Sequence, residues 1–441
     1  MKRTLLDKLI HWKNQTTRKP ILIDGARQTG KTFLLQALFG QTFPNSLRID
    51  FLETPNLKDA FDGSLHPDDI LTNIELITGQ NFNPETDLLI LDEIGECESA
   101  VTSLKYFAEK APTYYIAASG SNIGLLNTFP VGKVEQHNLR PLSFLEFLYA
   151  SEEKALIKAF EAQTNSLVVH SKLFDKLTDY YFTGGMPEAV STWFSNKNDS
   201  ILARIEKVSK IQEDLIEGYR RDFGKYSGKV NAQLIESVFN SIPSQLSAVM
   251  DESVKRFKFK NIIERKSRYS DFESAIHWLS RCRIALLSYP IEGLPRSPLA
   301  AYKKDNLVKL FLFDVGLLNH MLGTSYQELK QQNYEYKGYI AENFVQQELT
   351  TLGLGAGIAP SYSWNDARAE IEFLLTNEEG KIIPVEVKSG KRTRAKSLQS
   401  YITKCQPHKT FKLTGTQGSS ELEQTNIVMP LYYAMYLTQR W

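Results

Sequence analysis

Residues 19–40 read KPILIDGARQTGKTFLLQALFG, and this stretch decides the fold of the N-terminal part of the chain. A short apolar run after Pro20 predicts a strand, and the next residues match G-x-x-x-x-G-K-[ST] and lead into a helix with apolar periodicity. Glycines in such a turn let backbone N–H groups face phosphate oxygens, while Lys31 reaches the β- and γ-phosphates and Thr32 offers its hydroxyl to Mg²⁺. The sequence therefore predicts a P-loop nucleotide site made of Gly25, Ala26, Arg27, Gln28, Thr29, Gly30, Lys31, Thr32 and Phe33.

A second apolar strand is predicted at residues 87–93, which read DLLILDE and end in two carboxylates. A buried strand of this form places Asp92 beside the magnesium of a bound nucleotide, and Glu93 is then placed to orient or deprotonate a water molecule. The plainer alternative is a strand followed by the acidic first turn of a helix. We therefore expect hydrolysis as well as binding, with Lys31 and Glu93 as catalytic residues. Thr32 and Asp92 are the predicted magnesium ligands.

Length and composition indicate a globular chain of several domains. The chain has 441 residues, which corresponds to about two to four domains. Its 52 Lys and Arg balance 51 Asp and Glu, which excludes a polycation that binds nucleic acid through overall charge. The sequence has no run of 18 or more apolar residues, and its three cysteines are too far apart for a disulfide framework or a zinc site. We expect a cytoplasmic protein with no membrane partner.

The two nucleotide motifs and several later stretches resemble a bacterial and archaeal family of AAA-type ATPases. This family has a winged-helix-like middle and a C-terminal domain similar to the PD-(D/E)xK nucleases. The resemblance is carried by GARQTGKT, LLILDE, SGSN, RPLSFLEFL, GGMPEAV, AIHWLSRCRI, LFLFDVGLL, KGYIAENFV and IPVEVKSGKRTRAKSL, in this order.

The resemblance implies an α/β fold: a P-loop AAA-type parallel sheet with a helical lid, a winged-helix-like middle and a C-terminal α/β domain like the restriction endonucleases. We predict an AAA-type ATPase domain at 1–150, a helical lid or linker at 151–230, a winged-helix-like domain at 231–332 and a nuclease-like domain at 333–441. ATP and Mg²⁺ are the implied cofactors.

A third strand is predicted at residues 114–118, and it runs into a small polar cluster. In AAA-type ATPases this strand lies between the strands of the two nucleotide motifs, and its polar end senses the γ-phosphate. The resemblance therefore implies Ser119, Ser121 and Asn122 as sensor candidates. A plain strand-to-turn junction explains the same residues.

The resemblance also implies a homo-oligomer, as a ring for which a hexamer is one form, because each AAA-type site is completed by its neighbour. Relatives carry Gly-Arg shortly before the PLSF stretch, whereas this chain has Gly132 and Lys133. If that position acts on a neighbour's γ-phosphate, Lys133 keeps the charge but lacks the two-pronged guanidinium. Arg140 is the nearest substitute, and an exposed structural arginine is the alternative reading of that residue.

Helical patterns followed by two apolar extended stretches outline the winged-helix-like middle. Its basic segment contains Lys255, Arg256, Lys258, Lys260, Arg265, Lys266 and Arg268, interleaved with Phe257, Phe259 and Tyr269. Such a segment can neutralise the phosphates of DNA. Because Asp and Glu also stand nearby, a merely solvated basic face is an open alternative.

Carboxylates also gather in the C-terminal part of the sequence. Strand alternation places Glu370 with Glu372 on one face, and Glu386 with Lys388 on one face of the next strand. Carboxylates so placed can hold Mg²⁺ for phosphodiester cleavage. By resemblance, Glu372 stands where Asp is usual, Glu386 and Lys388 form the E-x-K pair, and Glu342 is the helix carboxylate. A solvent-facing charge pattern and a DNA-binding module without cleavage are the alternatives.

Three functions follow from the sequence. The first is an ATP-hydrolysing protein that acts on DNA by remodelling or processing it. The second is a nucleotide switch in signalling or defence that works through protein partners. The third is a Mg²⁺-dependent DNA nuclease that ATP licenses. Stimulation of hydrolysis by DNA separates the first from the second, and metal-dependent loss of intact DNA identifies the third.

Overall fold

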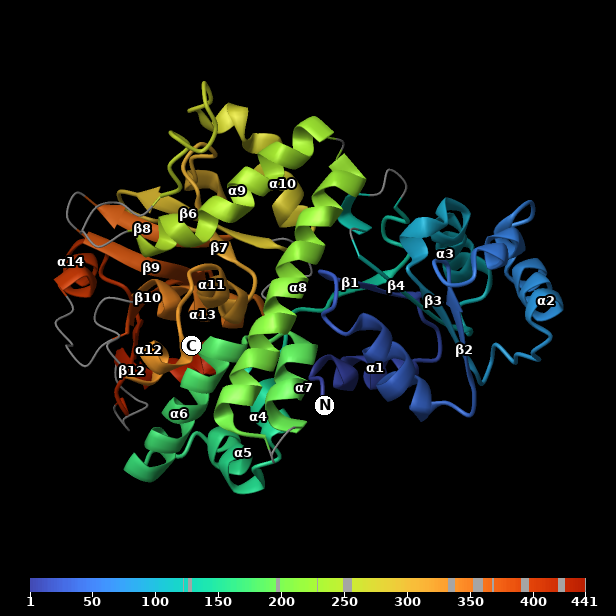
Figure 1. Cartoon of the computed structure of the whole chain (residues 1–441), viewed down its shortest axis with the longest axis horizontal. Coiled ribbons are helices and arrows are strands. Elements are labelled where there is room, and N and C mark those ends of the chain that lie inside the picture. Colours follow the sequence, from blue (N-terminus) through green and yellow to red (C-terminus); the bar gives the residue numbers. More distant parts are fainter. Residues whose placement is uncertain are drawn as a thin grey trace. The chain divides into compact units, whose positions relative to one another are not determined.

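The computed structural model describes residues 1–121, 123–125, 129–195, 199–227, 229–248, 256–331, 338–351, 360–366, 369–389, 396–418 and 425–440. The packing of the chain divides it into two compact units, Lys2–Arg140 and Pro141–Trp441, and Met1 groups with the second. Each unit has its own β-sheet (Figure 1). Each also has its own buried apolar side chains.

The N-terminal unit is built on a five-stranded parallel sheet with the strand order β2-β3-β4-β1-β5. Its strands are β1 (Ile21–Asp24), β2 (Ser46–Asp50), β3 (Leu88–Asp92), β4 (Tyr115–Gly120) and β5 (Glu135–Asn138). Its helical elements are α1 (Leu5–Lys13), η1 (Phe33–Phe39), η2 (Gly40–Thr42), η3 (Pro55–Phe61), α2 (Pro67–Thr78), η4 (Ile94–Glu96), α3 (Glu98–Lys110) and η5 (Ile123–Leu125). Strand β4 pairs with both β1 and β3, which confirms its predicted place between the strands of the two nucleotide motifs. The carboxyl ends of parallel strands meet at one edge, where ligands of such sheets bind.

Helices cover both faces of this sheet because its strands are apolar on both sides. Ile23 of β1 packs in one apolar cluster with Trp12 of α1 and Phe39 of η1. Its neighbour Leu22 points the other way and packs in a second cluster with Leu104 of α3. All five side chains are at most 1% exposed. Burial of a side chain of this size contributes about 1.5–3 kcal/mol, so packing on both faces holds the strands that carry the motifs.

The C-terminal unit begins with a helical region and has further helices between and after its strands. Its helical elements are α4 (Phe144–Ser151), α5 (Lys154–Glu161), α6 (Leu167–Thr183), α7 (Pro187–Ser195), α8 (Ile201–Ser227), α9 (Lys229–Ser247), η6 (Tyr269–Asp271), α10 (Glu273–Arg281), η7 (Leu299–Tyr302), α11 (Val315–Met321), α12 (Tyr326–Lys330), α13 (Gly338–Thr351), α14 (Lys396–Cys405) and η9 (Leu431–Arg440). Helix α4 begins with a capping box, in which Ser143 Oγ accepts from the Glu146 N–H and Glu146 Oε2 accepts from the Ser143 N–H. No helix in the described part of the chain is long and apolar enough to cross a membrane.

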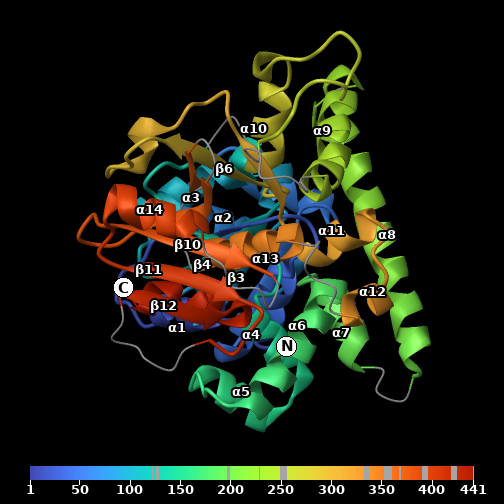
Figure 2. The same cartoon turned by 90° about the vertical axis from the view of Figure 1, so that its left-hand side faces the viewer.

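A seven-stranded mixed sheet forms the other half of this unit, with the order β12-β11-β10-β9-β8-β6-β7 (Figure 2). Its strands are β6 (Ala285–Glu292), β7 (Lys309–Leu312), β8 (Ser361–Asp366), β9 (Ala369–Thr376), β10 (Ile382–Lys388), β11 (Thr410–Thr414) and β12 (Asn426–Pro430). Strands β8, β9 and β10 run antiparallel in succession, whereas β11 is parallel to β10 and β12 is parallel to β11. The α/β class is therefore confirmed for the chain.

The middle of the chain differs from the winged helix that its pattern predicts. Strands β6 and β7 form the expected antiparallel hairpin, but β6 also pairs in parallel with β8. The hairpin is thus one edge of the seven-stranded sheet. The physical reason is visible in β6, which is buried at every residue except its last and suits a sheet covered on both sides. The boundaries of the four predicted domains stay a prediction.

Helix α13 is held in this unit by buried polar side chains. Asn343 bonds both backbone groups of Leu312, accepting from its N–H at 2.9 Å and donating to its carbonyl at 3.0 Å. Gln347 accepts from the Val315 N–H at 2.9 Å and donates to the Tyr180 hydroxyl at 2.9 Å. Because buried polar groups need such partners, these bonds fix the position of the helix that carries Glu342.

Candidate functional site

The P-loop turns between β1 and η1 through residues with unusual backbone angles. Gln28 and Gly30 have positive φ values of 62° and 89°, a region that glycine enters without steric cost. Gly25 is required by a close approach, because a Cβ there would lie 2.2 Å from the carbonyl oxygen of Leu139. Thr29 is buried and donates its hydroxyl to a loop carbonyl at 2.9 Å. These contacts give the loop one defined shape.

Lys31 lies inside the loop and is 5% exposed. Its ammonium donates to the carbonyls of Gly25 and Ala26 at 3.0 and 2.9 Å, and to Ser121 Oγ at 3.0 Å. None of these acceptors carries a charge. Burial lowers the pKa of Lys31, and Glu93 is foremost among the carboxylates that raise it again. A buried ammonium with neutral acceptors is stabilised by an anionic ligand such as a phosphate.

Asp92 ends β3 and brings together residues from three parts of the unit. Thr32 Oγ1 donates to Asp92 Oδ2 at 2.8 Å, Ser119 of β4 donates to Oδ1, and the Glu93 N–H donates to Oδ1 at 3.2 Å. Asp92 is 1% exposed, so these bonds fix its carboxylate in one orientation. The two predicted magnesium ligands, Thr32 and Asp92, are therefore neighbours.

Glu93 follows directly in a left-handed backbone conformation, with φ 49° and ψ 44°. For a residue other than glycine this conformation costs about 1–3 kcal/mol, and such strain gathers at functional sites. Burial raises the pKa of the Glu93 carboxyl, and Lys31 is the largest influence that lowers it. A carboxylate with a raised pKa is a stronger base, as the predicted role requires.

These residues fit a nucleoside triphosphate with its magnesium ion. The loop offers a buried ammonium with only neutral acceptors, and the end of β3 offers a hydroxyl and a carboxylate side by side. Hydroxyl and carboxylate oxygens are the ligands that Mg²⁺ prefers, together with phosphate oxygens.

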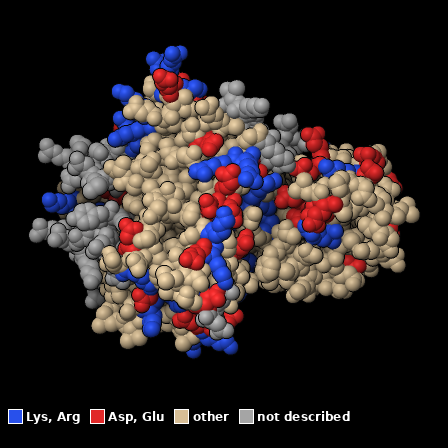
Figure 3. Space-filling model, in the orientation of Figure 1, with Lys and Arg blue, Asp and Glu red and all other residues tan. Residues whose placement is uncertain are grey.

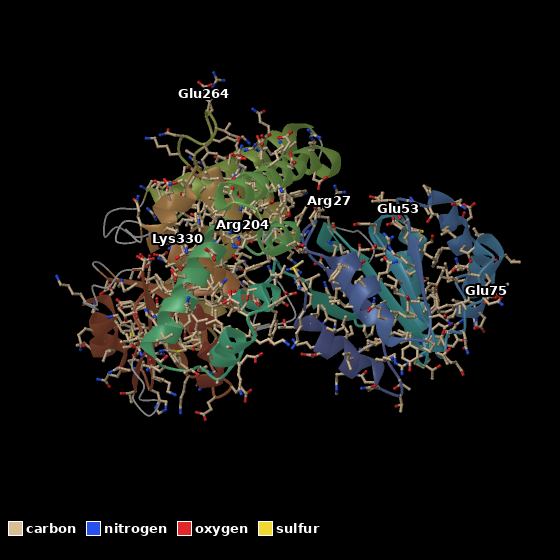
Figure 4. All side chains as sticks on the ribbon, turned by 60° about the horizontal axis from the view of Figure 1, so that its bottom comes forward. Arg27, Glu53, Glu75, Arg204, Glu264 and Lys330 are labelled. Atoms are coloured by element: carbon tan, nitrogen blue, oxygen red, sulfur yellow. The ribbon has the colours of Figure 1, made fainter. Side chains whose placement is uncertain are left out.

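Two arginines at this site are not predicted by any pattern in the sequence. Arg48 of β2 donates through Nε to Asp92 Oδ2 at 3.0 Å, and it also pairs with Asp50 and with Glu53, which is labelled in Figure 4. Arg3 donates to the carbonyl of Thr29 in the P-loop at 3.1 Å. The role of Arg48 depends on the pairing of β2 with β3, which no local pattern reveals.

The other predicted residues of the nucleotide site differ in their exposure to solvent. Arg27 is half-buried and is labelled in Figure 4, Gln28 is exposed, and Phe33 is 41% exposed. Ser119 contacts Asp92, whereas Asn122 lies outside the described residues.

The two candidates for action on a neighbouring subunit have partners within their own unit. Lys133 Nζ forms an ion pair with Glu109 Oε1 at 2.8 Å. Arg140 is half-buried, and its carbonyl accepts from Arg3 Nη2 at 2.6 Å. Both candidates stay predictions.

The C-terminal carboxylates form two clusters, each centred on a lysine. In the Lys309 cluster, the ammonium lies 2.5 Å from Glu342 Oε2 and 3.8 Å from Glu370 Oε1. In the Lys388 cluster, the ammonium lies 3.6 Å from Glu372 Oε1 and 3.5 Å from Glu386 Oε1.

Glu370 and Glu372 therefore have different lysine partners, although simple alternation places them on one face. The reason is an irregularity in the β8–β9 pairing, whose register shifts between the pairs Trp364–Ile371 and Tyr362–Leu374. Among the described residues, no group of three or more His, Cys, Asp and Glu is arranged to hold a metal ion. Glu342 lies with Lys309, whereas Glu372 and Glu386 lie with Lys388, and the metal site predicted from these three carboxylates stays a prediction.

The basic segment forms a projecting loop between α9 and α10. Its exposed cations are Arg256, Lys258, Lys260, Arg265, Lys266 and Arg268, while Lys255 lies outside the described residues. Phe257 is buried and Phe259 packs against it, with ring centroids 5.4 Å apart, so aromatic side chains anchor the base of the loop. Glu264 marks its tip in Figure 4, and Figure 3 shows Lys and Arg gathered at this end of the unit.

Three stretches of the chain match known protein families. Residues 17–148 match the family described as "AAA domain". Residues 174–328 and 337–434 match families described as "Domain of unknown function (DUF8612)" and "Domain of unknown function (DUF4143)". The N-terminal part is therefore a P-loop AAA domain, as predicted, and two domains of unknown function follow it.

One solved structure similar to this chain is described as the structure of C. elegans PCH-2. It is 13% identical, and the match covers 47% of this chain and 66% of that chain, just under two thirds, with a TM-score of 0.30. A likeness this weak carries no argument about fold or function. No curated protein matches the chain.

Proposed function

We propose that the AAA domain binds ATP with Mg²⁺ and hydrolyses it at the site of Lys31, Thr32, Asp92 and Glu93. The observation that carries this proposal is the joining of the P-loop to β3 through the bond from Thr32 to Asp92. The choice of ATP rests on the match to the AAA family.

Each of these side chains has a role that follows from its chemistry. Lys31 binds the β- and γ-phosphates through its buried ammonium. Thr32 and Asp92 are the residues that would hold the magnesium ion, which supplies positive charge to the phosphates when bound. Glu93 accepts a proton from the attacking water, and its raised pKa suits it to this task.

Lys31→Ala tests the proposed nucleotide site directly. Binding of a fluorescent ATP analogue and release of phosphate are measured for this variant, for the wild type and for Lys105→Ala, which removes an exposed lysine of α3 in the same unit. We expect Lys31→Ala to weaken binding by about tenfold or more and to abolish hydrolysis, because its ammonium is the principal buried cation for the phosphates. Lys105→Ala should match the wild type. Unchanged binding and turnover in Lys31→Ala would exclude the P-loop from the reaction.

The AAA domain is further proposed to work in a homo-oligomeric ring, in which Lys133 or Arg140 of one subunit acts on the nucleotide of the next. This proposal rests on the AAA match and on the cationic character of both residues. Lys133→Ala and Arg140→Ala are compared for nucleotide binding and for phosphate release. The residue that acts on the neighbour should lose hydrolysis and keep binding. Normal hydrolysis in both variants would rule out both residues.

DNA is the proposed target of the ATPase, and the exposed basic segment between α9 and α10 supports it. Its cations project from the surface, while Phe257 and Phe259 anchor the loop from within. Phosphate contacts of this kind make binding depend steeply on salt.

A double variant, Lys258→Ala with Lys260→Ala, tests the DNA proposal. The control removes two exposed lysines of α8, Lys207 and Lys210. In the variant that lacks Lys258 and Lys260, the negative slope of log affinity against log salt should become less steep by about 1–2. Stimulation of hydrolysis by DNA should weaken as well. If DNA neither binds nor stimulates the wild type, the second function, a switch that works through protein partners, replaces the DNA proposal.

A further inference from the structure

Lys309 is a buried lysine on the edge strand of the seven-stranded sheet. It begins β7 and is 6% exposed, whereas lysines are almost never buried unless they are paired. Its ammonium lies 2.5 Å from Glu342 Oε2, 3.8 Å from Glu370 Oε1 and 4.9 Å from the centre of the Phe311 ring. The ammonium therefore has carboxylates from α13 and β9 and an aromatic ring of its own strand around it.

Of the partners of Lys309, Glu342 is buried and Glu370 is partly buried. The side chains of Glu342 and Glu370 are 4% and 17% exposed. Two carboxylates that converge out of water repel each other unless a cation lies between them. In this structure the protein supplies that cation from its own chain.

A metal ion and this ammonium require the same space. Mg²⁺ and Ca²⁺ bind carboxylate oxygens at about 2.0–2.6 Å, and the ammonium already lies at a comparable distance from Glu342. Glu342 is the helix carboxylate of the predicted metal site and pairs with Lys309, whereas Glu372 and Glu386 contact Lys388. The pair of Glu342 and Glu370 thus does not fit a divalent ion while Lys309 lies between its carboxylates.

We propose that Lys309 is a built-in cation that fills the carboxylate pair of Glu342 and Glu370, so that this pair holds no divalent ion. The inference concerns the C-terminal unit and does not depend on hydrolysis at the P-loop.

The test is removal of the ammonium with the length of the side chain kept. Binding of Mn²⁺ to the full-length chain without nucleotide is measured by calorimetry for the wild type and for Lys309→Met. Lys304→Met is the control, because Lys304 pairs with Glu292 at the surface, where both side chains are more than half exposed. We expect Lys309→Met to gain about one Mn²⁺ per chain, and the wild type and Lys304→Met to lack it.

Further variants keep the test decisive if Lys309→Met is unstable. The melting temperature of Lys309→Met should then rise on addition of Mn²⁺, because the ion replaces the lost charge. The double variant Lys309→Met with Glu342→Gln should fold without metal and lose the gained site.

Two results would overturn the proposal. One is a folded Lys309→Met chain that binds no more Mn²⁺ than the wild type and is not stabilised by it. The other is a wild type that binds Mn²⁺ through Glu342 or Glu370, seen as loss of that binding in Glu342→Gln or Glu370→Gln.

Discussion

Substitution of Glu348 by Gln should stabilise the C-terminal unit at alkaline pH. Glu348 lies on α13 and is fully buried. Its Oε1 accepts from the Phe144 N–H at 3.0 Å at the start of α4, whereas its Oε2 has no hydrogen-bond partner among the described residues. Burial raises the pKa of Glu348 from 4.5 to about 8, and the nearby Glu146 adds to the shift.

The sign and the size of the effect follow from this pKa. The folded state favours the protonated carboxyl of Glu348. The contribution of this carboxyl to the stability of the folded state is therefore complete below pH 4.5 and is lost as the pH rises toward about 8. One pKa unit corresponds to about 1.36 kcal/mol, so Glu348 costs the folded state at most about 5 kcal/mol above pH 8. Gln keeps the acceptor for Phe144 and carries no charge. The stability difference between the two proteins should therefore be small at pH 5 and should grow with pH.

Thermal unfolding of the wild type and of Glu348→Gln between pH 5 and 9 measures this difference. Glu206→Gln, which changes an exposed carboxylate of α8, serves as the control and should follow the wild type at every pH. The reasoning is refuted if Glu348→Gln unfolds at a constant offset from the wild type over the whole pH range, or if its advantage shrinks as the pH rises.

Three further substitutions test single features of the fold and of the nucleotide site. Arg48→Gln removes the positive charge that lies beside Asp92, so the Mg²⁺ concentration for half-maximal hydrolysis should fall several-fold in a magnesium titration. A rise in that concentration would mean that Arg48 assists binding of the ion. Gly25→Ala places a Cβ 2.2 Å from a carbonyl oxygen and should abolish binding of an ATP analogue, and wild-type affinity would contradict the tight loop. Ser143→Ala removes the cap of α4 and should cost about 1 kcal/mol in urea unfolding, whereas an unchanged midpoint would show that the cap contributes nothing.

Local patterns predicted that the P-loop and the end of β3 lie together. The strand, the glycine turn and Lys31 lie within one short stretch, and Asp92 with Glu93 ends the next apolar strand. Parallel strands bring their carboxyl ends to one edge, so the meeting of these two stretches followed from sequence alone. Arg48 and Arg3 were missed because their roles depend on strand order and on long-range contacts.

The C-terminal unit was harder to predict, for physical reasons. An apolar run such as β6 has the same pattern in a hairpin and in the middle of a sheet, and only its pairing with β8 distinguishes the two. Strand alternation fails at the register shift in β9, which separates Glu370 from Glu372. The pairing of Lys309 with Glu342 joins residues from a strand and a distant helix. No periodicity in the sequence encodes that contact.

Glu93→Gln provides the most direct test of the claim that this AAA domain hydrolyses ATP through Glu93. Labelled ATP is bound to the wild type and to the variant with Mg²⁺, and the label that each protein retains is analysed after separation from free nucleotide. Because Gln keeps the shape of Glu93 but cannot accept the proton, the variant should bind ATP as tightly as the wild type and retain it uncleaved. The wild type should retain ADP or release it. Undiminished conversion of ATP to ADP by Glu93→Gln would contradict the account and assign the base to another residue.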